Sequence, residues 1–462
     1  MATISSTGLG SGLDINALVS QLVAAERAPK DQRLARDETR LTTELSALAA
    51  LKGAMAGLQS AANGVRGPDS FAARKVTVGD DKYFSASVDT DAVPGSYEVQ
   101  VQQLATAARL GSAAYAGGPD AVAGTGTLTI TVGAASFSLT LEEGSNSLAD
   151  LRDAINAADG NTGVRATLIR DAAGAYLVLS GTSTGAANAI TVSAGDDADT
   201  GLQQLVTDLN DFDATRDVVA QDAIAYVSGY EIRSASNAIT GAIDGVTLDL
   251  KKATAPGETI TLTVARDDAA IQKKAEAFVS AYNALAQQMA SLGSYDAATQ
   301  TAGPMLGDSL LRGLDTQLRR MLTEPVPGTT GDYRTLASLG ISMTVKGTLQ
   351  LDAARFQKAL AADPDAVNRV FSSESGVAVR VGKYLDDRLS SSGEFAARDE
   401  RISTQRRRLT QEKEALDARM LVVQQRYLRQ FTAMDSMLAQ LQSTSDYLTQ
   451  QLASLSKNSS GG

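Results

Sequence analysis

The C-terminal part of the chain carries its most regular hydrophobic pattern. The run from Glu394 to Lys457 contains no Gly and no Pro, and apolar residues recur there in steps of four and three. This is the a/d pattern of a coiled coil, and it predicts one helix of about 95 Å at 1.5 Å per residue. The two columns are Met420, Tyr427, Met434, Leu441, Leu448 and Leu455, and Phe431, Leu438 and Leu452.

The apolar stripe of this helix changes sides between Val423 and Phe431. Before this point, the second apolar column lies three residues after the positions of the first. After it, the second column lies four residues after them. Positions separated by three and by four residues flank opposite sides of a column on a helix. We interpret the shift as a change of partner, from the chain's own helices to other molecules. The alternative is that the whole stripe packs within the chain.

A second apolar pattern lies at the N-terminus. Asp14 is placed to cap a helix that runs to Pro29, with Leu13 and Leu18 as a hydrophobic staple. A second helix is expected from Lys30 to Asn63. The apolar residues of the two helices are Ile15, Leu18, Val19, Leu22 and Val23 on the first, and Leu34, Leu41, Leu48 and Met55, with Leu45, Leu51 and Leu58 beside them, on the second. These faces predict pairing with the C-terminal helix.

The middle of the chain has a different pattern of apolar and polar residues. From about Arg74 to Val264, short alternating segments rich in Thr and Val are separated by Gly, Asp and Pro-Gly turns, which predicts strands. Two helices are expected among them, at 148–158 and 202–211. The Gly- and Ala-rich passage from Tyr115 to Gly126 is predicted to cross between two β-rich domains. After Asp267 the helical period returns, with a hairpin expected around 341–351.

The predicted fold class is α+β and multidomain, with the terminal helices paired as a coiled-coil or helical-bundle stalk and two nested β-rich domains inserted between them. We expect four parts. They are a terminal coiled-coil region (1–35 and 410–462), a helical bundle (36–70 and 268–409), a β-rich domain (71–111 and 226–267) and an inserted β-rich domain (112–225).

Composition narrows the possible chemistry. The chain has no Cys and no His, which excludes disulfides, thiolate zinc sites and histidine bases. A net charge of −11 argues against nucleic acid as a partner. No apolar run is long enough to predict a membrane span, and residues 1–12 do not resemble a secretory signal.

No acidic cluster predicts catalysis or metal binding. The group Asp196-Asp197-Ala198-Asp199 lacks the ligand spacing of a calcium loop, and we interpret it as a solvated turn. No pair of carboxylates stands out in an apolar setting. We therefore expect a protein that is not an enzyme and that needs no cofactor and no metal.

Several short motifs, in collinear order, resemble one family. They are Gly8 to Ile15, Val101 to Ala105, Ile155-Asn156 with Gly163 to Ala166, Ser236 to Ile239, Tyr282-Asn283, Gly347 to Leu349, and Tyr427 to Asp435. The chain resembles the flagellar filament cap family, hook-associated protein 2 (FliD). Ile155-Asn156 and the segment that follows are similar to the IN motif shared by flagellins and cap proteins.

The resemblance implies a non-enzymatic assembly protein at the distal tip of the bacterial flagellum. It implies export through the flagellar type III apparatus, a ring of about five or six subunits, and promotion of flagellin insertion, folding and polymerisation. The implied partners are flagellin, the hook–filament junction protein, and a dedicated export chaperone that binds the C-terminal helix.

The predicted interface with subunits, filament and chaperone lies on the terminal helices. Its residues are Ile15, Leu18, Leu22, Tyr427, Phe431, Met434, Leu438, Leu441, Leu448, Leu452 and Leu455. Two alternatives stay open. One is an adhesin whose β domains, around 111–225, bind a host or surface glycan. The other is a hook–filament junction protein, against which the motifs after Leu339 argue.

Overall fold

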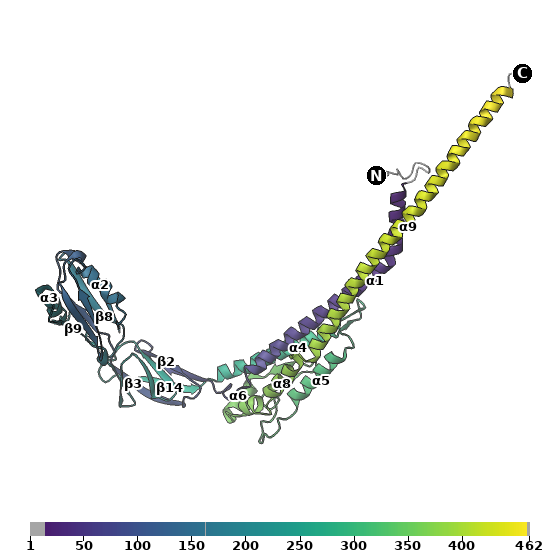
Figure 1. The fold of residues 1–462 in the computed structure, drawn as a ribbon. Coiled ribbons are helices and arrows are strands. Elements are labelled where there is room, and N and C mark those ends of the chain that lie inside the picture. Colours follow the sequence, from purple (N-terminus) through teal and green to yellow (C-terminus); the bar gives the residue numbers. More distant parts are fainter. Residues whose placement is uncertain (1–13, 162, 460–462) are drawn as a thin grey trace. The chain divides into compact units, whose positions relative to one another are not determined.

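The computed structural model describes residues 14–161 and 163–459, with side chains as far as Ala453 (Figure 1). The chain divides into two compact units. The first, which we call the helical unit, consists of residues 1–70 and 272–462, and the second, the β unit, consists of residues 71–271. The mixed α+β class, with long helices near both ends of the chain and sheets between them, is confirmed.

Two long helices dominate the helical unit, α1 (Ile15–Asn63) and α9 (Glu394–Ser459). They lie side by side in Figure 1. As predicted, Asp14 caps α1: its carboxylate accepts a hydrogen bond from the backbone N–H of Ala17 (3.0 Å). Leu13, the other half of the predicted staple, lies outside the described residues.

The predicted break at Pro29 is wrong, because α1 runs through it. Proline lacks an N–H, so the carbonyl of Ala25 loses its helical donor at this point. Both residues are exposed, and water can therefore replace the missing donor. Apolar packing of the flanking turns on α9 outweighs the local preference of Pro29 to end a helix.

Shorter elements complete the helical unit around the α1–α9 pair. The ring edge of Phe278 meets the ring of Phe371 at 5.5 Å and 88°, and both side chains are fully buried. The expected hairpin is present as β17 and β18. The elements are α4 (Asp268–Leu292), β15 (Tyr295–Asp296), β16 (Thr301–Ala302), α5 (Ser309–Thr323), β17 (Ile341–Met343), β18 (Leu349–Leu351), α6 (Ala353–Ala362), α7 (Ala366–Ser372) and α8 (Val377–Leu389).

The β unit contains two hydrophobic cores. The first lies between a five-stranded antiparallel sheet in the order β1-β14-β3-β10-β11 and a three-stranded sheet in the order β12-β13-β2. The strands are β1 (Arg74–Val78), β2 (Phe84–Val88), β3 (Gly95–Gln103), β10 (Ala223–Val227), β11 (Tyr230–Ser234), β12 (Ala238–Ile243), β13 (Val246–Leu250) and β14 (Ile260–Arg266).

The second core is inserted between β3 and β10. Its two three-stranded sheets have the orders β4-β8-β7 and β6-β5-β9, and two amphipathic helices contribute leucines to it. Its elements are β4 (Arg109–Gly111), β5 (Gly126–Val132), β6 (Ala135–Leu141), α2 (Leu148–Ala157), β7 (Val164–Arg170), β8 (Ala175–Gly181), β9 (Ile190–Ala194) and α3 (Thr200–Asn210), with 3-10 turns at Gly118–Asp120 and Ala186–Asn188.

The passage from Tyr115 to Gly126 lies within the inserted core and does not cross between domains. Tyr115 pairs with Ala175, the first residue of β8, and Ala123 is fully buried in this core. The chain enters and leaves the inserted core where Thr106 pairs with Gln221. Gly124 and Gly126 have positive φ and lie against the backbone at and just before the start of α3, where a side chain would clash.

Asparagines in three of the recognised motifs each hold a second segment of backbone. In each case the amide nitrogen donates to a backbone carbonyl and the amide oxygen accepts from the N–H of the same residue. The three pairs are Asn156 with Ala166 (2.8 and 3.0 Å), Asn237 with Ala105 (2.9 and 2.8 Å) and Asn283 with Leu349 (2.8 and 2.7 Å). These pairs give a physical reason why the motifs occur together, since each asparagine needs a matching backbone segment.

Candidate assembly interface

The α1–α9 pair is held by an apolar seam along its proximal part, the part of α9 as far as Val423. The seam side chains of α9 recur at heptad spacing and are buried, as are those of α1 that face them. Burying such columns is the main source of stability in a two-helix stalk. The seam residues are Phe395, Ile402, Leu409, Leu416, Met420 and Val423 on α9, and Leu34, Leu41, Leu48 and Met55 on α1.

Polar contacts flank this seam and show that the helices are antiparallel. Residues 398–399 of α9 pair with residues 44–52 of α1, residues 412–417 pair with residues 27–38, and residue 427 pairs with residue 26. Mostly exposed pairs of this kind contribute little free energy each, so their main effect is on register. They are Lys52–Asp399 (2.9 Å), Glu44–Arg398 (3.0 Å), Glu38–Lys413, Arg33–Glu412 (3.3 Å), Arg27–Asp417 (2.6 Å) and Glu26–Tyr427 (3.2 Å).

One pair at the base of the stalk is largely buried. Arg398 of α9 contacts Asp308 (2.6 Å) as well as Glu44 of α1. Asp308 is also the N-cap of α5, where its other oxygen accepts from the N–H of Leu310 (2.9 Å). A single guanidinium therefore connects α9 to both α1 and α5, and the nearby carboxylates raise its pKa against the opposing effect of burial.

Beyond Asp435, α9 continues without α1 beside it (Figure 1). Every side chain from residue 436 to residue 453 is exposed, including large apolar ones that are 39–66% accessible. We call this set the distal apolar face. It consists of Met437, Leu438, Leu441, Tyr447, Leu448 and Leu452.

The predicted interface residues fall into three environments. Ile15 is buried, and Leu18, Tyr427 and Phe431 are partly buried at the end of the pair. Leu22 and Met434 are exposed at its margin (38% and 43%), and Leu438, Leu441, Leu448 and Leu452 belong to the distal apolar face. The side chain of Leu455 lies outside the described ones. That these residues form an interface stays a prediction.

Some exposed apolar residues lie outside the heptad columns. Leu421 and Val422 are 61% and 64% exposed on the side of α9 away from the seam, and Met437 and Tyr447 widen the distal apolar face. A strict a/d template discards such positions. The signal that could have found Leu421 and Val422 is the run of four consecutive apolar residues at 420–423.

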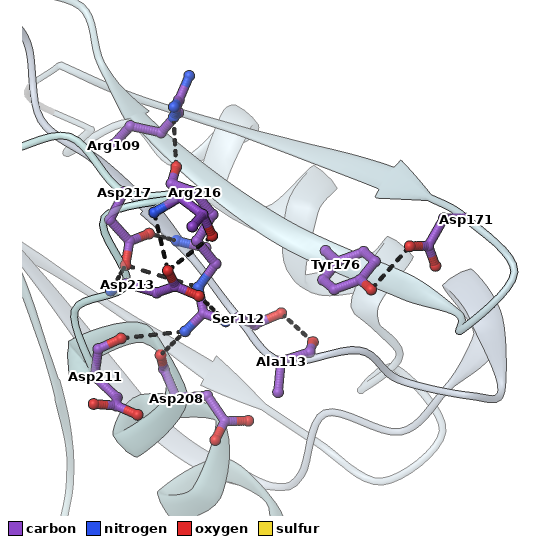
Figure 2. Close-up of polar contacts among 12 residues, drawn as sticks. Arg109, Ser112, Ala113, Asp171, Tyr176, Asp208, Asp211, Asp213, Arg216 and Asp217 are labelled. Carbon is purple, nitrogen blue, oxygen red and sulfur yellow. Dashed lines mark hydrogen bonds and ion pairs between the residues drawn. The ribbon is translucent and has the colours of Figure 1, made fainter.

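The densest polar cluster of the inserted core is structural in character (Figure 2). The buried carboxylate of Asp217 accepts from the N–H groups of Gly111 and Asp213 (both 2.8 Å), and Arg216 lies 3.7 Å away. Buried Ser112 accepts from the N–H of Leu177 (2.9 Å). The buried carboxylate of Asp217 and the buried hydroxyl of Ser112 thus satisfy backbone N–H groups, as buried polar groups in a folded core usually do.

The acidic group at 196–199 holds backbone and hydroxyl groups. Asp199 caps α3 and accepts from the N–H groups of Leu202 (2.8 Å) and Thr125 (2.9 Å), and these bonds lower its pKa. Asp197 accepts from the hydroxyl of Thr127 (2.8 Å). Among residues 14–161 and 163–459, no group of three acidic side chains is arranged to hold a metal ion. Nor is any helix within those ranges both long and apolar enough to span a bilayer.

The sequence matches known protein families along most of its length. Sequence models described as flagellar hook-associated protein 2 N-terminus and C-terminus match residues 11–108 and 220–443, and one described as flagellin hook IN motif matches residues 127–183. The B-type flagellar hook-associated protein 2 of Pseudomonas aeruginosa is 34% identical over 97% of this chain and 98% of its own. Flagellar hook-associated protein 2 of Escherichia coli K12 is 32% identical, with 98% of each chain covered.

A solved structure agrees with these matches. The crystal structure of the D1-D2-D3 domains of the flagellar cap protein FliD from Escherichia coli superposes with a TM-score of 0.65 at 31% identity, covering 76% of this chain and 98% of that one. The helical stalk and the inserted β cores thus define a structural protein of the bacterial flagellum. The chain belongs to the flagellar hook-associated protein 2 family, the FliD cap proteins.

Proposed function

We propose that this chain assembles as a ring at the distal tip of the flagellar filament and promotes the insertion and folding of flagellin there. The distal apolar face carries the proposal. A monomer rarely leaves such a stripe of leucines, with Met437 and Tyr447, open to water unless it binds a partner. Burying it against similar helices at the filament end would release about 25 cal/mol for each Å² of apolar area.

The contrast along α9 supports a change of partner near Tyr427. As far as Val423 the apolar residues of the seam are buried against α1, and beyond Asp435 the apolar residues are open. The proximal part therefore holds the subunit together, and the distal part is free to bind flagellin or a neighbouring subunit. Before export, a dedicated flagellar chaperone would cover the same distal face, and the chain would leave through the type III apparatus.

The proposal is tested by complementing a strain that lacks the gene. We expect wild-type protein to restore filaments and the Leu441→Gln/Leu448→Gln variant to fail, because the distal apolar face becomes polar. A matched control is Gln442→Ala/Gln450→Ala, which changes exposed polar positions in the same stretch. Full-length filaments in the deletion strain itself would contradict capping. Normal filaments with the double glutamine variant would contradict the role of this face.

A further inference from the structure

A charged pocket in the helical unit has no assigned role. It lies between α5 and α8, has a volume of about 420 Å³, and we call it the α5–α8 pocket. Three cationic side chains, Arg320, Arg380 and Lys383, and two carboxylates, Glu324 and Asp387, line it. The lining therefore carries one net positive charge in a chain whose overall charge is −11.

Arg380 is the unusual member of this lining. Its Nη2 donates to the carbonyl of Met321 (3.0 Å) in the last turn of α5. Its Nε is buried and has no hydrogen-bond partner in the described part of the chain, nor does the guanidinium form an ion pair there. Burial lowers the pKa of Arg380, with Glu324 giving only partial compensation. A half-buried cation without a counter-ion costs free energy that an incoming anion would recover.

The neighbouring side chains do not supply that anion. Arg320 is already engaged with Glu324 at 2.8 Å, one helical turn away on α5. Lys383 is exposed at the mouth of the pocket. The remaining cations, Arg380 and Lys383, face the single carboxylate of Asp387, so one positive charge is left over. The guanidinium of Arg380 has the planar geometry suited to a carboxylate.

We propose that the α5–α8 pocket binds an Asp or Glu side chain of a second copy of this chain. A single carboxylate matches the one surplus charge of the lining, whereas a phosphate dianion would be repelled by Glu324 and Asp387. The chain has 53 acidic and 42 basic residues, so the surface of a second copy presents carboxylates in excess. The inference rests on the proposed ring and adds to it a point of contact between subunits.

Zero-length crosslinking tests the contact directly. A carbodiimide joins a lysine amine only to a carboxylate in contact with it. We expect a mixture of isotopically light and heavy full-length protein to give a mixed crosslink from Lys383 to an Asp or Glu of another copy. Lys383→Arg should abolish that crosslink. The inference is overturned if Lys383 couples only within its own chain or not at all, or if filament tips show it coupled to flagellin.

Variants of Arg380 separate charge from structure. Arg380→Gln can still donate to Met321 but carries no charge, and we expect it to weaken self-association in sedimentation velocity about tenfold or more. Arg380→Lys should retain most of the association. Gln317→Ala is the matched control, because Gln317 lines the same pocket without a charge, and it should associate like wild type.

Two further outcomes bear on the inference. If Arg380→Gln lowers the thermal unfolding midpoint as much as it lowers association, Arg380 is a structural cap of α5 and the inference fails. Wild-type association with Arg380→Gln overturns it too, even where complementation shows that the protein caps filaments. Failure of wild-type protein to restore filaments would instead count against the proposed function.

Discussion

Asn283 and Leu349 exchange two hydrogen bonds that join α4 to the β17–β18 hairpin. The Asn283 amide nitrogen donates to the Leu349 carbonyl (2.8 Å), and the Leu349 N–H donates to the Asn283 amide oxygen (2.7 Å). The hydroxyl of the preceding residue, Tyr282, donates to the carbonyl of Gly347 (2.9 Å). Two adjacent side chains of one helix thus fix the position of the whole hairpin.

Removing the Asn283 side chain should leave two backbone groups of Leu349 without partners. We expect Asn283→Ala to destabilise the helical unit by about 2–4 kcal/mol, since each unpaired buried group costs about 1–3 kcal/mol. Asn283→Asp can still accept from the Leu349 N–H but cannot donate, so its effect should be smaller. Urea unfolding followed by circular dichroism measures both. Equal stability of Asn283→Ala and wild type would contradict the assigned role.

The cluster around Asp217 predicts a similar cost in the inserted core. Asp217→Ala removes the acceptor of two N–H groups and leaves Arg216 without a nearby buried counter-ion (Figure 2). We expect a loss of about 3 kcal/mol or more and faster hydrogen exchange in β4 and β8. Asp213→Ala is the control, because its carboxylate is more exposed and should matter less. Unchanged exchange in β4 with Asp217→Ala would refute the assignment.

The cap of α3 predicts a pH dependence. Hydrogen bonds from the N–H groups of Leu202 and Thr125 lower the pKa of Asp199 below its usual 3.8. Its stabilising contribution is therefore complete above about pH 4 and is lost as the pH falls through the lower folded-state pKa. Asp199→Asn still caps but does not ionise, so its unfolding midpoint should fall less below about pH 4 than that of wild type.

A control for this measurement is Asp196→Asn. The Asp196 carboxylate forms no hydrogen bond or ion pair in the part of the chain that the structure describes. Its variant should follow the wild-type profile on acidification. An Asp199→Asn profile that also coincides with wild type would show that the cap does not titrate as assigned.

Pro29 predicts a gain of stability on substitution. Pro29→Ala restores the hydrogen bond to the Ala25 carbonyl at an exposed position and should stabilise the first half of α1 by as much as about 3 kcal/mol. Hydrogen exchange at residues 25–33 should slow accordingly. Ala35→Gly, at an exposed position of the same helix, should destabilise the helix by about 1 kcal/mol. Faster exchange in Pro29→Ala would contradict the continuous helix.

Much of this architecture follows from patterns in the sequence. The heptad columns predict α9 and its seam with α1, and strand alternation predicts a β-rich region from about 74 to 264, because local periodicity reports which face of an element is buried. The break at Pro29 was predicted wrongly because packing on α9 outweighs a local preference. The prediction that residues 115–126 cross between domains was also wrong, since composition alone does not distinguish a linker from a segment packed inside one core.

The sequence carries less information about the assembly interface than about the helices and strands. The stripe at Met434, Leu438, Leu441 and Leu448 predicts a helix face, but no pattern shows whether that face is covered. Only the structure shows that α1 packs beside α9 as far as Val423 and that the side chains beyond Asp435 are exposed. The pocket around Arg380 has no sequence signal at all, because α5 and α8 are far apart in the chain and only packing brings them together.

Cysteine labelling at Leu441 tests whether the distal apolar face is covered in the filament, because the chain contains no Cys and a single introduced thiol reports one position. In free protein, Leu441→Cys should react rapidly with a maleimide, and Ile402→Cys, in the buried seam, should react slowly. On isolated flagella, we expect Leu441→Cys to be protected from the maleimide to a similar degree as Ile402→Cys. Equal labelling of Leu441→Cys in free protein and at filament tips would contradict the account.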